Sequence, residues 1–230
     1  MSKRALCHVY EVTEKLQQRY HDFAHNNRQN PLDELLFIIC SIKTSDKSYE
    51  STYKDLRRTF PTFQMIAEAP AEYIARPLMP GGLYNQKSDA IKKILEAIIK
   101  HFGKPTLAPL KQMSDAECEN FLTSLPGVGK KVARCVMLYS LDRRVFPVDT
   151  HCWRICRRLG WIKPTRPDRS CSPKDMDRLQ SKIPEALRFS LHVNMVSLGR
   201  EVCKAHKPGC RRCSIADFCP RIGAGHKGIH

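Results

Sequence analysis

Two residues with complementary chemistry stand eighteen positions apart near the middle of this chain, each at the start of a predicted helix. Lys131 opens one helical run and Asp149 precedes the next. The positive potential of a helix N-terminus and the neighbouring Lys130 disfavour the charged form of Lys131, so this amine could act as a nucleophile. The Asp149 carboxylate could stabilise a developing positive charge and help to deprotonate the amine. Taken singly, such a lysine is more often solvated and such an aspartate is more often a helix cap.

The turn before Lys131 has the residues needed to expose backbone amides. It reads Leu-Pro-Gly-Val-Gly over residues 125–129, and Gly127 and Gly129 can take backbone angles that are closed to other residues. Exposed amides at the start of a helix form an anion site. We therefore predict that a phosphate is bound here by Gly127, Val128, Gly129 and Lys130.

Four cysteines near the end of the chain share the spacing of a metal-binding loop. They follow the pattern C-x6-C-x2-C-x5-C and are Cys203, Cys210, Cys213 and Cys219. Four thiolates within residues 203–219 could hold zinc or an iron–sulfur cubane, and the spacing leaves both open. The other seven of the 11 cysteines lie in apolar or helical context, which is typical of reduced, buried thiols.

The charge balance indicates a polyanionic partner. The 230 residues include 39 Lys and Arg against 23 Asp and Glu, a formal net charge of +16. Such an excess attracts phosphates and favours nucleic acid, although a basic surface can also serve solubility alone. The sequence opens without a secretory signal and has no apolar run of about 18 residues, so we expect an intracellular protein that does not span a membrane.

Helices must position these groups, because apolar residues recur at steps of three and four and few segments alternate with period two. We predict an all-α protein of about ten helices, with start signals at Asn30-Pro31, at Ser114 with Glu117, and at Ser172-Pro173. Two lobes are expected: a central helical barrel over residues 30–141, and a lobe built from residues 1–29 and 142–230. On one helical face of the second lobe, we expect phosphates or acidic neighbours to contact Arg154, Arg157 and Arg158.

The turn and lysine over residues 125–131, followed by Pro-Val-Asp-Thr-His over residues 147–151, resemble the helix–hairpin–helix glycosylases, endonuclease III above all. The resemblance covers roughly residues 30–220. It implies a two-lobed helix–hairpin–helix fold in which Lys131 attacks the sugar C1′, Asp149 assists, and a Schiff base undergoes β-elimination. It also implies that the four cysteines hold a 4Fe–4S cluster. The loop that contains them carries basic residues suited to the DNA backbone, among them Arg211 and Arg212.

The same resemblance implies which residues enter the DNA when the target nucleotide leaves the stack. Leu83, followed by Tyr84, matches the hydrophobic wedge of the family. Lys43 stands where relatives carry a glutamine. Lysine can donate a hydrogen bond but cannot accept one, so its contact with the orphaned base must differ. Alternatively, Lys43 contacts only phosphate.

The resulting hypothesis is a base excision repair enzyme that removes damaged bases from double-stranded DNA and cleaves the strand at abasic sites. Oxidised pyrimidines are the expected substrates, and the protein is expected to act as a monomer, in the cytoplasm or nucleoid if the cell is prokaryotic. One alternative is a mismatch-specific or other-lesion glycosylase of the same superfamily. Another is a non-catalytic iron–sulfur protein that only binds DNA. A third is an iron–sulfur redox sensor.

Overall fold

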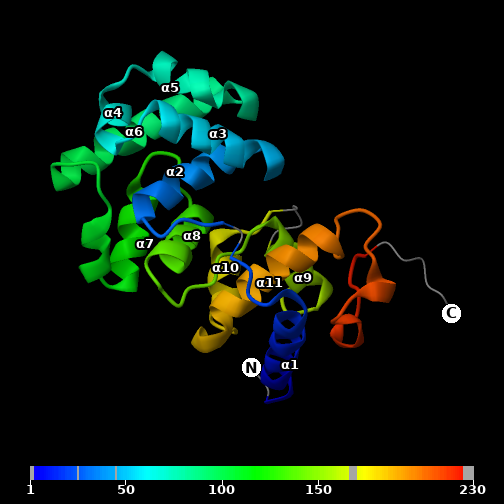
Figure 1. The fold of residues 1–230 in the computed structure, drawn as a ribbon. Helices are drawn as coiled ribbons and strands as arrows, with labels where there is room; N and C mark the ends of the chain where they lie inside the picture. The colour runs from blue at the N-terminus through cyan, green and yellow to red at the C-terminus, as the bar shows by residue number, and fades with distance from the viewer. Residues whose placement is uncertain (1–2, 25, 45, 166–169, 225–230) are drawn as a thin grey trace. The chain divides into compact units, whose positions relative to one another are not determined.

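The computed structural model describes residues 3–24, 26–44, 46–165 and 170–224. Within these residues the chain forms eleven α-helices, five short 3₁₀-helices and no β-strand, which confirms the all-α prediction (Figure 1). The helices divide into two compact units. One is the continuous segment Asn26–Arg143, and the other combines Met1–His25 with Arg144–His230. None of the described helices is long and apolar enough to cross a lipid bilayer.

The central unit packs its helices around the apolar helix α2. In this helix Asn30 accepts hydrogen bonds from the amides of Leu32 and Asp33, and Pro31 is the first helical residue, as the sequence predicts. Helix α2 packs against α3 and α8, and α6 packs against α5 and α2. The α-helices of this unit are α2 (Pro31–Ser41), α3 (Asp46–Thr59), α4 (Phe63–Glu68), α5 (Ala71–Leu78), α6 (Tyr84–Phe102), α7 (Asp115–Ser124) and α8 (Lys130–Ser140), with 3₁₀-helices at Met79–Gly81 and Ala108–Gln112.

The terminal unit combines the first helix of the chain with the segments that follow Arg143. Helix α1 packs against α11, and α11 packs against α9, around a core that includes Leu16, Phe146, Cys152 and Met195. Its α-helices are α1 (Lys3–Tyr20), α9 (Thr150–Arg158), α10 (Pro173–Gln180) and α11 (Arg188–Glu201), with 3₁₀-helices at Glu185–Leu187, Cys210–Arg212 and Ala216–Phe218.

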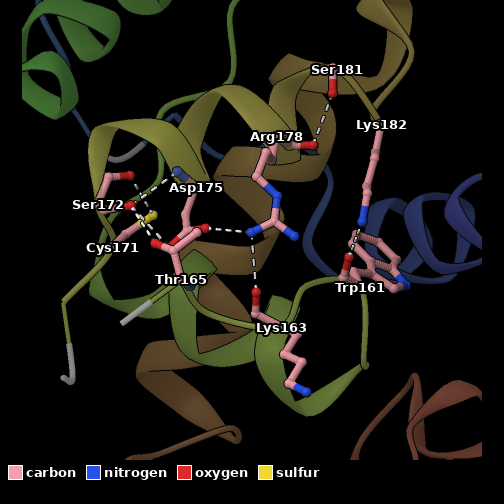
Figure 2. Close-up of polar contacts among 9 residues, drawn as sticks. All are labelled: Trp161, Lys163, Thr165, Cys171, Ser172, Asp175, Arg178, Ser181 and Lys182. Atoms are coloured by element: carbon pink, nitrogen blue, oxygen red, sulfur yellow. Dashed lines mark hydrogen bonds and ion pairs between the residues drawn. The ribbon is translucent and has the colours of Figure 1, made fainter. Parts of the chain in front are cut away.

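A buried carboxylate holds the connection between α9 and α10, as Figure 2 shows. Asp175 is only 1% exposed and accepts hydrogen bonds from the Thr165 and Ser172 hydroxyls and from Arg178. Burial alone would raise the pKa of Asp175, but these hydrogen bonds outweigh burial and hold the pKa below its usual value. The carboxylate therefore ties Thr165 to the first turn of α10, where Ser172 is the N-cap.

Candidate functional site

The turn before α8 has the open backbone that the sequence predicts. Gly127 has φ +75°, in the left-handed region that favours glycine, and Val128 N donates to Leu125 O at 3.1 Å. A Cβ added at Gly127 or Gly129 would meet nothing within 4 Å. Gly129 is the N-cap of α8 and offers no capping side chain. The first amides of α8 therefore lie behind a turn whose outer face is open to a ligand.

The two lysines that follow the turn have different surroundings. The Lys130 ammonium lies 3.1 Å from Glu119 Oε1, and Arg134 Nε lies 2.6 Å from Glu119 Oε2. The negative charge of Glu119 thus partly compensates Lys130, which the sequence places among the phosphate contacts. Lys131 is half-buried in the first turn of α8.

A buried carboxyl group on α2 was missed in the sequence and lies in the electrostatic environment of Lys131. Glu34 has no exposed surface, and its oxygens accept hydrogen bonds from Asn27 Nδ2 at 2.5 Å and from Arg28 N at 2.6 Å. Burial raises the pKa of Glu34 to about 7, while these hydrogen bonds and the positive charges of Arg28 and Lys131 oppose the rise. The sequence shows Glu34 only as a first-turn acid of α2, a position where an exposed carboxylate is common.

The raised pKa of Glu34 predicts a pH-dependent stability. Because the pKa rises from 4.5 to about 7 on folding, the folded state holds the proton more tightly. This contribution to stability is complete below the unfolded-state pKa and is lost as the pH rises through about 7. Between about pH 5 and about pH 8 the Tm of Glu34→Gln should therefore rise relative to wild type, as thermal unfolding would measure.

Glu117 provides the matched control for this measurement. It forms the capping box with Ser114, and hydrogen bonds from Ser114 lower its pKa. The stability it contributes is lost only as the pH falls through that lowered value, so Glu117→Gln should give a constant Tm difference over the same range. A constant difference for Glu34→Gln as well would contradict the assignment of a raised pKa to Glu34.

The two segments expected to enter DNA both lie in the central unit, and each carries a non-glycine residue in the left-handed region. Lys43 has φ +51° and follows α2, and Leu83 has φ +53° and is the residue before α6. Leu83 and Tyr84 are 39% and 37% exposed, and Lys43 is also exposed. The wedge candidate Leu83 is therefore an apolar side chain that is partly exposed to solvent.

In the terminal unit, Asp149 is the N-cap of α9. Its Oδ1 accepts from the amide of Cys152 at 2.7 Å, and the side chain is half-buried. The following His151 packs so closely on α11 that a Cβ at Gly199 would lie 2.5 Å from its Nδ1. Burial lowers the pKa of His151. The cap fixes the direction of the carboxylate while leaving the group partly open, so Asp149 can have both roles considered for it.

The four terminal cysteines come together on one cavity of the terminal unit. Cys203, Cys210, Cys213 and Cys219 all line it, with apolar neighbours such as Ile155, Leu198 and Ile215. Over the described ranges, no three His, Cys, Asp or Glu side chains are spaced to hold one metal ion. Burial raises the pKa of Cys213 and Cys219, and negative charge on the neighbouring thiolates raises it further. Four thiolates lining this cavity would repel one another unless a cationic centre were bound between them.

Two of the three arginines of α9 donate to the loop after α11, whereas the Arg157 guanidinium lies 5.8 Å from the centre of the Trp153 ring. Arg158 is buried and donates to Cys203 Sγ at 3.1 Å and to the carbonyls of Lys204 and Ala205. Arg154 donates to the Cys203 carbonyl at 2.7 Å. The prediction that these two arginines meet phosphates or acidic neighbours is therefore wrong, because the backbone carbonyls after α11 need donors.

Comparison with known proteins agrees with this architecture. Residues 36–181 match the model of the HhH-GPD superfamily base excision DNA repair proteins. Endonuclease III of Sulfolobus acidocaldarius is 31% identical over 199 residues, covering 83% of this chain and 82% of the relative. Endonuclease III of Thermotoga maritima is 29% identical over 198 residues, covering 86% of both. A relative in Arabidopsis thaliana is 32% identical over 199 residues, and the match spans 66% of its length.

The fold is also that of a solved protein. A structure described as a non-covalent endonuclease III–DNA complex superposes with a TM-score of 0.79 at 23% identity, covering 94% of this chain and 95% of the other. The fold and the turn with its lysine define the class, which is the helical DNA glycosylases of base excision repair. The chain belongs to the HhH-GPD superfamily, and within it to the endonuclease III-like helix–hairpin–helix proteins.

Proposed function

We propose that this glycosylase is bifunctional, removing damaged bases from double-stranded DNA and then cleaving the strand at the abasic site. One observation carries the proposal: Lys131 lies half-buried in the first turn of α8, the helix that follows a turn whose Gly127 and Gly129 border open space. The turn over residues 125–129 suits one backbone phosphate of the damaged strand. A phosphate bound there would bring the sugar of the strand close to the Lys131 amine.

The reaction uses the Lys131 amine as nucleophile and the Asp149 carboxylate as its partner. The nitrogen of Lys131 forms a bond to C1′ of the deoxyribose, the C1′–base bond breaks, and the base leaves with the electron pair and takes up a proton. Asp149 stabilises the positive charge that develops on the sugar and accepts the proton lost by the amine. The C1′–O4′ bond then breaks, O4′ takes up the proton held by Asp149, and the lysine nitrogen becomes a protonated imine of C1′. This imine acidifies the C2′ hydrogen, and loss of that proton breaks the C3′–O bond and expels the 3′ phosphate by β-elimination.

The preferred lesions are proposed to be oxidised pyrimidines, and the protein is proposed to act as a monomer. Both follow from the resemblance to endonuclease III and from the relatives that carry this name. Lys43 replaces the glutamine that the family places opposite the orphaned base. We therefore expect the dependence on the opposite base to differ from that of the family, since an ammonium group only donates hydrogen bonds.

Labelled duplexes with one lesion each test the function. The expected result is release of an oxidised pyrimidine together with a strand break that needs no added alkali. Base release without a break would make the protein a monofunctional glycosylase. Binding to abasic DNA with neither product would make it a non-catalytic DNA-binding protein. A panel that varies the base opposite the lesion measures the contribution of Lys43.

The four terminal cysteines are proposed to hold a 4Fe–4S cluster. The convergence of all four on one cavity supports this, as do the buried Arg158, which donates to Cys203 Sγ, and the basic Arg211 and Arg212 beside the site. When bound, the cluster would neutralise thiolate repulsion and order residues 203–219. Arg211 and Arg212 lie exposed on this loop, where they are proposed to meet the DNA backbone.

Metal analysis tests the cluster directly. Purified protein should contain iron and acid-labile sulfide at about four atoms each per chain, without stoichiometric zinc. Cys213→Ser should lose both and unfold at a lower temperature. Cys171→Ser, a half-buried cysteine of the same unit outside the set, should keep both. Stoichiometric zinc without iron in the wild-type protein would replace the cluster with a zinc site.

A further inference from the structure

A buried lysine joins the two segments of the central unit that are expected to enter DNA. Lys87 lies in the first turns of α6 and is only 3% exposed. Its Nζ donates to Thr44 Oγ1 at 2.5 Å and to the Gly81 carbonyl at 3.1 Å. The Thr44 hydroxyl donates to the same carbonyl at 2.7 Å. A closed set of three hydrogen bonds thus links residues 42–44 to residues 79–83.

The chemistry of this link indicates that it fixes the positions of the two segments and does not serve mainly to stabilise the fold. Both acceptors of the Lys87 ammonium are neutral oxygens, and burial lowers the pKa of Lys87. A buried charge with only neutral acceptors is a costly way to stabilise a fold. The acceptor carbonyl is well anchored, because Gly81 is buried and a Cβ there would lie 2.9 Å from Thr52 Oγ1 on α3.

The link also explains an unusual backbone on both sides of it. Lys43 precedes Thr44 and has φ +51°, and Leu83 follows two residues after Gly81 and has φ +53°. Residues with a side chain seldom adopt this region, and they remain in it only where their surroundings fix them. The exposed tips of the two segments, Ile42 and Leu83, are 40% and 39% exposed, so packing over the tips does not supply that constraint.

We propose that Lys87, with Thr44, is a positioning residue that joins residues 42–44 and 79–83 into one rigid element for opening the DNA duplex. The inference rests on the proposed function, from which it takes the roles of Lys43 and Leu83. It adds that the two side chains enter the duplex together, at a separation set by the hydrogen bonds of one ammonium group. Recognition of the damaged site then depends on Lys87 although this residue does not reach the DNA.

The structure offers a matched control on the same helix. Lys92 Nζ donates to the carbonyls of Ala67 and Ala69, with the second bond at 3.1 Å, and so ties α6 to the end of α4. Lys92→Met removes a lysine-to-carbonyl link comparable to that removed by Lys87→Met, but away from both segments. Thr44→Val provides a second test that leaves the Lys87 charge in place.

The experiment measures binding and base opening without requiring catalysis. Each full-length variant is titrated with a duplex that contains a reduced abasic-site analogue opposite 2-aminopurine, and with the undamaged duplex. Fluorescence of 2-aminopurine rises when the base is unstacked, so it reports entry of the element into the helix. Borohydride trapping on natural abasic DNA at saturating protein measures the chemical step separately.

For Lys87→Met we expect about tenfold weaker binding to the abasic analogue, as for a lost buried hydrogen bond to a charged group. The 2-aminopurine signal should fall, binding to undamaged duplex should stay within about twofold, and the trapping rate at saturation should stay within about threefold. Thr44→Val should behave alike, and the double variant should lose little more than either single variant, because both act on one link. Lys92→Met should retain wild-type binding and signal even if its Tm falls.

Wild-type discrimination and a wild-type 2-aminopurine signal in both Lys87→Met and Thr44→Val would overturn the proposal. An equal loss of affinity for undamaged duplex would also overturn it, because it would show a general structural role. If the wild-type protein opens the duplex but is never trapped, the proposed chemistry fails and the positioning role is still decided by the variants. If the wild-type protein gives no 2-aminopurine signal, the positioning role itself fails.

Discussion

Replacing Lys131 with alanine is expected to abolish the borohydride-trapped complex with abasic DNA and to lower base release by roughly 10³-fold or more, as loss of a nucleophile does. Only a primary amine on the protein can form the imine that borohydride reduces. Lys131 is half-buried in the first turn of α8, and alanine is favourable in a helix, so α8 should persist. Denaturing electrophoresis of the trapped complex gives the measurement.

Lys130→Ala separates the nucleophile from the local charge. It removes one positive charge at the adjacent position, where the ammonium is paired with Glu119. We expect weaker binding to DNA but intact trapping at saturating DNA. A trapped complex that persists in Lys131→Ala, or that disappears only in Lys130→Ala, would assign the Schiff base to another amine and remove Lys131 from its proposed role.

Asp149→Asn is expected to lower base release by about 10²- to 10⁴-fold while leaving the fold intact. Asparagine caps helices as well as aspartate does, so the hydrogen bond to the Cys152 amide can be kept while the charge is lost. The effect on preformed abasic DNA should be smaller, because no base departs there and less positive charge develops on the sugar. Single-turnover rates on lesion DNA and on abasic DNA give the two values.

Asp149→Ala distinguishes the two roles of this residue. It removes the cap as well as the charge, and loss of a cap costs about 1 kcal/mol, which thermal unfolding should detect. Asn and Ala variants that lose the same activity but differ in stability would support the division between chemistry and capping. Full base release by Asp149→Asn would reduce Asp149 to a cap.

The sequence predicts the starts of those helices that are capped by a side chain just before their first turn. Asn30 with Pro31, the Ser114–Glu117 box, Asp149 and Ser172 all act as the sequence indicates. Helix α6, in contrast, begins at Tyr84 without such a signal. Its N-cap is Leu83 in a left-handed conformation, which has no capping side chain, so nothing in the pattern marks it.

Tertiary packing decided the features that the sequence did not show. Glu34 and Lys87 are polar residues in ordinary helical positions, and only the folding of distant segments buries them. The acceptors of Lys87 come from two other parts of the chain, and those of Arg158 come from the loop after α11. Such partners have no fixed sequence spacing, so the sequence does not reveal them. The turn, the lysine and the four cysteines differ, because their spacing in the sequence already predicts their chemistry.

The discontinuity of the terminal unit has a consequence for biosynthesis. Helix α1 is made before the central unit, yet it packs against α11, which is made more than 150 residues later. The central unit is continuous in sequence and can fold while translation proceeds, whereas the unit with the cysteine loop must wait for its last segments. During that interval the apolar face of α1, which includes Val12 and Leu16, has not yet packed against α11. A nascent chain of this kind would rely on the ribosome surface or a chaperone to shield that face, and the proposed cluster could form only after residues 203–219 have been made.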